Sequence, residues 1–155
     1  MLNAEEQRIV DDVEQFGWHI RCVGPPIGSE DRTEWFGYTI GLAKTFGWPE
    51  LICFHVDLRV IANLLNLAVE ECRRRGVVPS AGLELTGVVE GAPARLAPTK
   101  PMADYYLKNA RWFAEREGLP FSVLQLLWPD NTGHFPDDPG CEQDVRRWQT
   151  PMAIG

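Results

Sequence analysis

A long amphipathic helix set among strand-like segments is the feature that most restricts the fold of this chain. Asp57 is placed to cap the first turn of this helix and Gly76 to end it, so the helix runs to Arg75. Its apolar residues recur at helical spacing and form one stripe: Val60, Ile61, Leu64, Leu65, Ala68 and Cys72. Such a stripe has to be buried against another layer of secondary structure.

Two more helices and six short strands are expected around this helix. A helix over 3–16 has Asn3 and Glu6 spaced as a capping box and Gly17 as its stop, and a helix over 101–118 begins on Pro101. The strand-like segments are 18–23, 34–40, 51–56, 83–91, 94–98 and 121–128. They do not alternate regularly with helices. We therefore expect one α+β domain over 1–155, with a mixed or antiparallel sheet of five to six strands, about three helices packed on it, and a tail over 141–155.

Charge argues against a nucleic-acid partner. The 155 residues carry a formal net charge of −7, and the basic residues are scattered apart from the run Arg73–Arg75. A duplex-binding surface needs concentrated positive charge to displace counterions, whereas three arginines at a helix C-terminus are explained by the helix dipole. Nucleic acid is therefore excluded as a partner, and the sequence leaves the oligomeric state open.

The ends and the cysteines of the chain favour a cytoplasmic protein. The first residues are acidic where a signal peptide would be basic and then apolar, and no segment approaches the roughly 18 apolar residues of a membrane span. The four cysteines form no C-x-x-C pair, so we interpret them as small hydrophobic residues in a reducing compartment.

Five segments in order resemble one bacterial family, domain of unknown function family 4262. These are GWHI (17–20), FGYTIGL (36–42), FGWPELICF (46–54), LLN (64–66) and VLQLLWPDNTGHFP (123–136). The resemblance covers about 15–140 and implies no reaction, because the family has no assigned activity. Two positions depart from its pattern: Trp48 stands where His is usual, and Asp137 where Trp is usual.

The segment over 36–51 predicts a turn that faces a ligand or a partner. Gly41 and Gly47 supply the positive φ angles that a sharp connection between two strands demands. Tyr38, Thr39 and Glu50 put a phenol, a hydroxyl and a carboxylate beside this backbone. Glu50 fits two interpretations equally, a turn closed by accepting a backbone N–H and a general acid or base.

Further polar and aromatic residues in these motifs extend the candidate site. His19 stands in the first strand, on the side opposite its neighbours, and Gln125 lies in an apolar strand where a buried amide needs a hydrogen-bond partner. The turn after that strand adds four residues: Trp128, Asp130, His134 and Phe135. We expect His19, Tyr38 and Gln125 to converge on one site.

Two functions fit these observations. The first is a domain that binds a small molecule, with His19 or Glu50 as a catalytic acid or base and Tyr38, Thr39, Gly41, Gln125 and the turn residues as ligand contacts. The second is a protein-interaction module, immunity-like or tethering, with an acidic, tryptophan-bearing face. We prefer the first, because the unusual polar residues fall within the motifs.

The cofactor stays open. The YTIGL segment resembles flavin-binding split barrels, but no phosphate-binding loop accompanies it. His19, His55 and His134 lack the local spacing of a zinc site, and no nucleophile elbow or nucleotide-binding glycine fingerprint occurs. We therefore predict no metal-ligand residues, and neither a serine hydrolase nor a Rossmann or P-loop enzyme.

Overall fold

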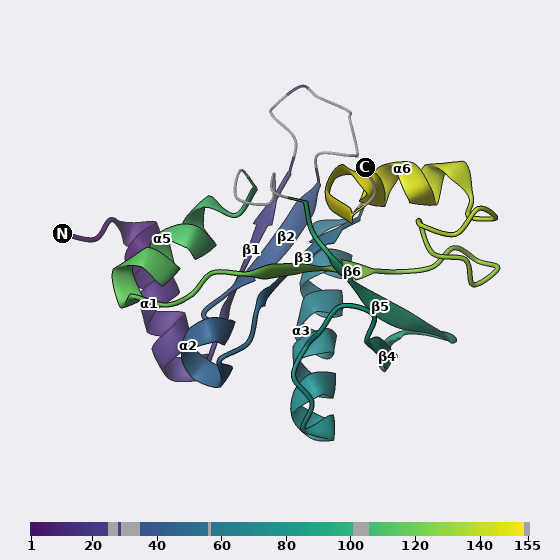
Figure 1. The fold of residues 1–155 in the computed structure, drawn as a ribbon. Coiled ribbons are helices and arrows are strands. Elements are labelled where there is room, and N and C mark those ends of the chain that lie inside the picture. Colours follow the sequence, from purple (N-terminus) through teal and green to yellow (C-terminus); the bar gives the residue numbers. More distant parts are fainter. Residues whose placement is uncertain (25–27, 29–34, 56, 101–105, 154–155) are drawn as a thin grey trace.

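The computed structural model describes residues 1–24, 28, 35–55, 57–100 and 106–153, and its described part contains a six-stranded sheet with helices on both faces (Figure 1). The elements in chain order are α1 (Ala4–Phe16), β1 (His19–Val23), β2 (Phe36–Ile40), α2 (Leu42–Phe46), β3 (Glu50–Phe54), α3 (Leu58–Arg75), β4 (Glu84–Val89), β5 (Ala92–Pro98), α5 (Lys108–Glu117), β6 (Val123–Leu127) and α6 (Gln143–Ala153). The predicted α+β class is confirmed.

The sheet is mixed, with the strand order β1-β2-β3-β6-β5-β4. Neighbouring strands pair antiparallel except in the centre, where β3 and β6 run parallel with Leu51 opposite Leu124. The chain therefore makes its long crossover, through α3, the β4–β5 hairpin and α5, between the two central strands. Because β3 and β6 are parallel, their carboxyl ends lie at the same edge of the sheet.

Alternate residues of the strands feed two separate cores. On one face, Leu51 and Cys53 of β3 pack in one apolar cluster with the buried stripe of α3. On the other face, Ile52 and Phe54 lie in a second cluster that also holds residues of α1 and α5. This alternation is the expected consequence of side chains pointing to opposite sides of a strand.

The predicted caps of the first two long helices are confirmed. Asn3 and Glu6 exchange backbone and side-chain hydrogen bonds at the start of α1, and Gly17 follows its end with φ 101°. Asp57 accepts from the backbone N–H of Arg59 at the start of α3, and Gly76 ends that helix. These helices are set by local chemistry, which is why sequence patterns locate them well.

Two segments hold helices that the sequence patterns did not predict, and the predicted start of another helix is not described by the structure. The connection after β2 holds a one-turn helix, α2, between Gly41 and Gly47, whose positive φ angles match expectation. The described part of the third helix, α5, begins at Lys108, and the predicted start at Pro101 lies outside the described residues. The tail predicted over 141–155 contains a helix that the sequence patterns did not indicate: Gln143–Ala153 form α6, which is held by tertiary contacts of Val145 and Gln149.

The helices in the described part of the chain are too short or too polar to cross a lipid bilayer.

Candidate functional site

Glu50, at the amino end of β3, holds the turn around α2 together. Its Oε1 accepts hydrogen bonds from Thr39 Oγ1 at 2.9 Å and from the Leu42 backbone N–H at 3.2 Å. Its Oε2 accepts from the backbone N–H groups of Gly41 at 3.2 Å and Ala43 at 3.3 Å. One carboxylate thus satisfies the N–H groups that the short helix α2 leaves unpaired at its start.

The burial of Glu50 gives it an unusual proton affinity but little access. Desolvation raises the pKa of Glu50 to about 7, although all four hydrogen bonds favour the carboxylate and oppose the rise. A pKa near neutrality suits a general base. The side chain, however, is enclosed, with the residue 4% exposed and both oxygens occupied by protein donors, so the geometry favours the turn-closing interpretation.

Gly41 has to be glycine for two physical reasons. Its φ of 101° lies in the left-handed region, and a Cβ built there would stand 2.6 Å from a methyl carbon of Val13 in α1. Thr39, which is fully buried, accepts from the Leu51 backbone N–H through the hydroxyl that it donates to Glu50. Both predicted ligand contacts therefore lie inside the fold.

Tyr38 and His19 project from neighbouring strands onto the α1–α5 face. The buried Tyr38 hydroxyl is hydrogen-bonded to the Arg21 side chain and to the backbone of Asn109 at the start of α5, and burial raises its pKa. His19 Nδ1 lies 2.6 Å from the Asp12 carboxylate of α1. Each polar group thus joins the sheet to a different helix.

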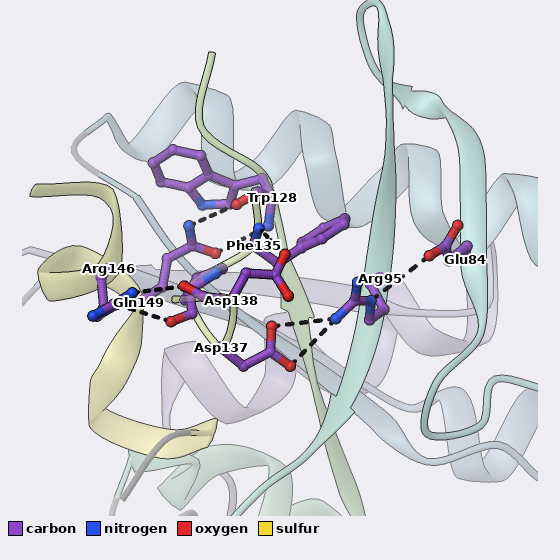
Figure 2. Close-up of polar contacts among 9 residues, drawn as sticks. Glu84, Arg95, Trp128, Phe135, Asp137, Asp138, Arg146 and Gln149 are labelled. Atoms are coloured by element: carbon purple, nitrogen blue, oxygen red, sulfur yellow. Dashed lines mark hydrogen bonds and ion pairs between the residues drawn. The ribbon is translucent and has the colours of Figure 1, made fainter. Parts of the chain in front are cut away.

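Gln125 joins the sheet to α6. It is fully buried in β6 and donates from Nε2 to the backbone oxygen of Gln149 at 2.7 Å. Gln149 in turn accepts from the Trp128 backbone N–H and donates to the Trp128 backbone oxygen, as Figure 2 shows. Gln125 Oε1 has no hydrogen-bond partner within the described part of the protein.

The three residues expected to converge share one face of the sheet but do not form one cluster. Tyr38 pairs with Ile52, and Ile52 pairs with Gln125, so one apolar residue separates the phenol from the amide. His19 pairs with Ile40, one row along β2 from Tyr38. Their contacts run to three different helices, and their role as a common ligand site stays a prediction.

Asp130 shapes the turn after β6. Its Oδ1 accepts from the backbone N–H and hydroxyl of Thr132 and from the His134 backbone N–H, and its Oδ2 accepts from the Glu142 backbone N–H at 2.8 Å. These hydrogen bonds lower the pKa of Asp130 well below its ordinary value. His134 is exposed and lies 2.7 Å from the Thr132 hydroxyl. The loop is therefore held by a side-chain acceptor at its centre.

Phe135 and the two positions that depart from the family pattern lie in local packing contacts. The guanidinium of Arg95 stands 4.1 Å from the Phe135 ring and contacts the Asp137 carboxylate at 3.2 Å, so Asp137 fills its position with an ion pair (Figure 2). Trp48 stacks on Phe46 with ring centroids 4.3 Å apart.

His55 and Trp128 occupy matching positions after the two parallel strands. His55 follows the last residue of β3, and Trp128 follows the last residue of β6. The Trp128 indole donates to the Phe54 backbone oxygen at 2.7 Å, and its ring centroid lies 4.6 Å from that of His55. The two rings therefore form one aromatic wall at the carboxyl edge of the central strands.

A groove of about 590 Å³ opens beside this wall; we call it the β3–β6 groove. Helix α3 forms one side and the turn of the β4–β5 hairpin the other. The lining residues are His55, Val60, Asn63, Leu64, Leu67, Gly87, Val88, Val89, Glu90, Gly91 and Trp128. Trp128 is the one residue of the predicted site that lines this groove.

Hydrogen bonding fixes the form of the His55 ring. Its Nδ1 accepts from the Asp57 backbone N–H at 3.2 Å, so the neutral ring carries its proton on Nε2. Burial lowers the pKa of His55, which keeps the ring neutral at pH 7. His55 thus offers an N–H donor without a charge.

Metal and thiol chemistry find little support in the described residues. His19 contacts α1, His55 lines the groove and His134 stands in the exposed loop, and no described group of three His, Cys, Asp or Glu is arranged to hold an ion. The four cysteines are free, and burial raises the pKa of Cys72 to about 11. A thiol with so high a pKa is a poor nucleophile at pH 7.

The fold and the groove define an α+β domain with a groove at the carboxyl ends of a parallel strand pair. The family model described as Domain of unknown function (DUF4262) matches residues 12–142, and the chain belongs to this family. No curated protein and no solved structure matches the chain. Family membership therefore implies no reaction for this chain.

Proposed function

We propose that this domain binds a small organic molecule in the β3–β6 groove. The observation that carries the proposal is the position of His55 and Trp128 at the carboxyl ends of the parallel pair, where a groove of about 590 Å³ opens. Ligand sites in proteins commonly enclose about 300–1,000 Å³, with aromatic and apolar walls and a few polar groups.

The path of the chain supports this location. After β3 it enters α3, which packs on the face of Leu51 and Leu126. After β6 it returns through a loop to α6, which contacts Gln125 on the opposite face (Figure 1, where α3 lies below β6 and α6 above it). Chains that leave adjacent parallel strands toward opposite faces create a crevice at the strand ends, where ligands bind in α/β sheets.

The lining has the composition that a small molecule needs. Val60, Leu64 and Leu67 of α3 supply apolar surface, and the ring of Trp128 supplies a flat aromatic one. His55 Nε2–H and the exposed amide of Asn63 are polar groups that can orient a ligand. The groove thus offers a ligand both apolar surface and polar groups that can fix its orientation.

Binding is a better supported proposal than catalysis. Glu50 is enclosed and hydrogen-bonded on both oxygens, which leaves no room for a substrate. His19 contacts the carboxylate of Asp12, whose side chain is 32% exposed, and such a pair is suited to acid–base chemistry. His19, however, stands in the edge strand of the sheet and does not line the groove. A catalytic role for either residue stays a prediction.

The burial of the tryptophans weighs against the interaction module. All six are partly buried, and Met1, Phe16 and Val78 are the exposed large hydrophobic residues of the described chain. An interface built on tryptophan anchors would need those rings at the surface before binding. We therefore favour the ligand-binding function.

A fragment screen with a groove-filling variant tests the proposal. Small aromatic fragments are screened by saturation-transfer NMR against the wild type and against Asn63→Trp, which places a large ring in the groove from an exposed position on α3. We expect fragments that bind the wild type and lose their signal with Asn63→Trp.

The control variant is Glu115→Trp, which adds the same ring at an exposed position of α5 on the other side of the sheet. This variant should keep the fragment signals. Fragments that bind all three proteins equally, or an absence of any binding fragment, would refute the groove as the ligand site.

A further inference from the structure

The charge of the β3–β6 groove is one-sided. Glu90, in the turn of the β4–β5 hairpin, is a carboxylate among the lining residues, and the described residues of that lining include no lysine or arginine. Glu90 is exposed and has no ion-pair or hydrogen-bond partner among the described residues. Glu71, which stands beside Gly87, is already paired with Arg74 at 2.5 Å. The groove therefore presents one uncompensated negative charge.

The aromatic wall of the groove suits a positive charge as well. The face of an indole attracts cations more strongly than the face of the other aromatic side chains. His55 beside it does not repel a cation, because burial lowers the pKa of the imidazole and keeps it neutral. The apolar residues of α3 complete the site with a surface for the uncharged part of a ligand.

We propose that the ligand of the β3–β6 groove is a small organic cation, an amine joined to an apolar or aromatic body. This inference rests on the proposed function and specifies the class of ligand. The ammonium group interacts with Glu90 and the indole face, and the body lies along Val60, Leu64 and Leu67. An organic acid is disfavoured, because it would bring a second carboxylate to Glu90, and the described lining has no basic residue to neutralise either charge.

Three probes of matched shape test the inference: tryptamine, tryptophol and indole-3-acetate, which carry an ammonium, a hydroxyl and a carboxylate on the same ring. Each is titrated into the ¹⁵N-labelled protein at pH 7, and the dissociation constant is read from backbone amides of 87–91. We expect tryptamine to bind roughly three- to tenfold more tightly than tryptophol, from one exposed ion pair and one cation–π contact. Indole-3-acetate should bind more weakly than both.

The variant Glu90→Gln isolates the charge of the groove. It should weaken the binding of tryptamine and reduce its preference over tryptophol to the part that the cation–π contact supplies, while the affinity for tryptophol stays nearly the same. Glu115→Gln removes the same charge from α5, and it should keep the preference for the amine, because charges beyond about 10 Å are screened at 0.1 M salt.

The outcomes separate the two proposals. Equal affinity for tryptamine and tryptophol in the wild type would overturn the cation inference and leave the groove as a ligand site. A preference for tryptamine that is undiminished in Glu90→Gln, or that disappears in Glu115→Gln, would also overturn it. Absence of binding by all three probes would contradict the proposed function itself.

Discussion

The two ends of strand β3 use polar side chains in opposite ways. At the amino end, Glu50 is buried and each of its oxygens accepts two hydrogen bonds from the protein. At the carboxyl end, His55 is half-buried and lines the β3–β6 groove. Its Nδ1 accepts a hydrogen bond from the Asp57 backbone N–H. Glu50 at the amino end therefore stabilises the fold, whereas His55 at the carboxyl end keeps its Nε2–H for a ligand.

This difference shows how to separate a structural polar residue from a binding one. A buried group whose hydrogen bonds are all made inside the protein stabilises the fold, and its removal leaves partners unpaired. A polar group whose donor faces an open groove is already solvated by water, so its replacement changes the free energy of unfolding little. Motif position alone does not distinguish the two, because both ends of β3 lie in or beside family-like segments.

The largest expected effect is at the amino end. Glu50→Ala removes the acceptor of four donors and leaves a cavity, so we expect the free energy of unfolding to fall by about 3–5 kcal/mol. Urea melts of the wild type and the variant measure it. A loss below 1 kcal/mol would show that Glu50 does not hold the turn and would return it to the candidates for catalysis.

A smaller effect is expected at Tyr38. Tyr38→Phe removes the hydroxyl that joins Arg21 to the start of α5 and keeps the ring in its core, so stability should fall by about 1 kcal/mol. Fragment binding should be unchanged, since Tyr38 does not line the groove. Unchanged stability together with lost binding would instead support the site predicted from sequence.

The stability contributed by Asp130 should depend on pH. The folded pKa of Asp130 lies below its ordinary value of 3.8, so the folded state binds fewer protons, and this stability is present above about pH 4 and is lost as the pH falls through the folded pKa. Asp130→Asn removes the ionisation and the bond from the Glu142 backbone N–H.

Thermal melts of the wild type and Asp130→Asn from pH 7 down to pH 2 check this. The melting temperature of Asp130→Asn should be lower at pH 7, and the difference should shrink in acid. A constant difference across the range would mean that the carboxylate charge does not stabilise the loop.

The smallest effect on stability is expected at the carboxyl end. Glu90→Gln and Asn63→Trp both change exposed side chains that line the groove, so each should alter the free energy of unfolding by no more than about 0.5 kcal/mol. The same urea melts give the comparison with Glu50→Ala. A large destabilisation by Glu90→Gln would mean that this carboxylate supports the hairpin.

Sequence patterns predicted those parts of the fold that local chemistry decides. The capping box of Asn3 and Glu6, the Asp57 cap and the glycine stops are contained within a few residues, so they could be found without the structure. Helix α6 was missed because its order depends on Gln149 meeting Trp128 and Gln125, a contact between distant segments.

The groove was missed for a related reason. Its lining comes from a helix stripe, a hairpin turn and two strand ends, and in sequence each of these looks like ordinary structure. One signal was present: His55 and Trp128 each follow the last residue of a buried apolar strand. Such residues meet at one edge once the strands are known to be parallel, and that pairing is a tertiary fact.

We expect ligands to bind at the carboxyl end of β3 and not at its amino end. A map of amide chemical-shift changes on addition of tryptamine tests this directly. The largest changes should occur over 60–67 and 87–91 and at the Trp128 indole N–H, with little change over 38–43. The largest changes at Tyr38, Gly41 and Ala43, with the groove unaffected, would contradict it.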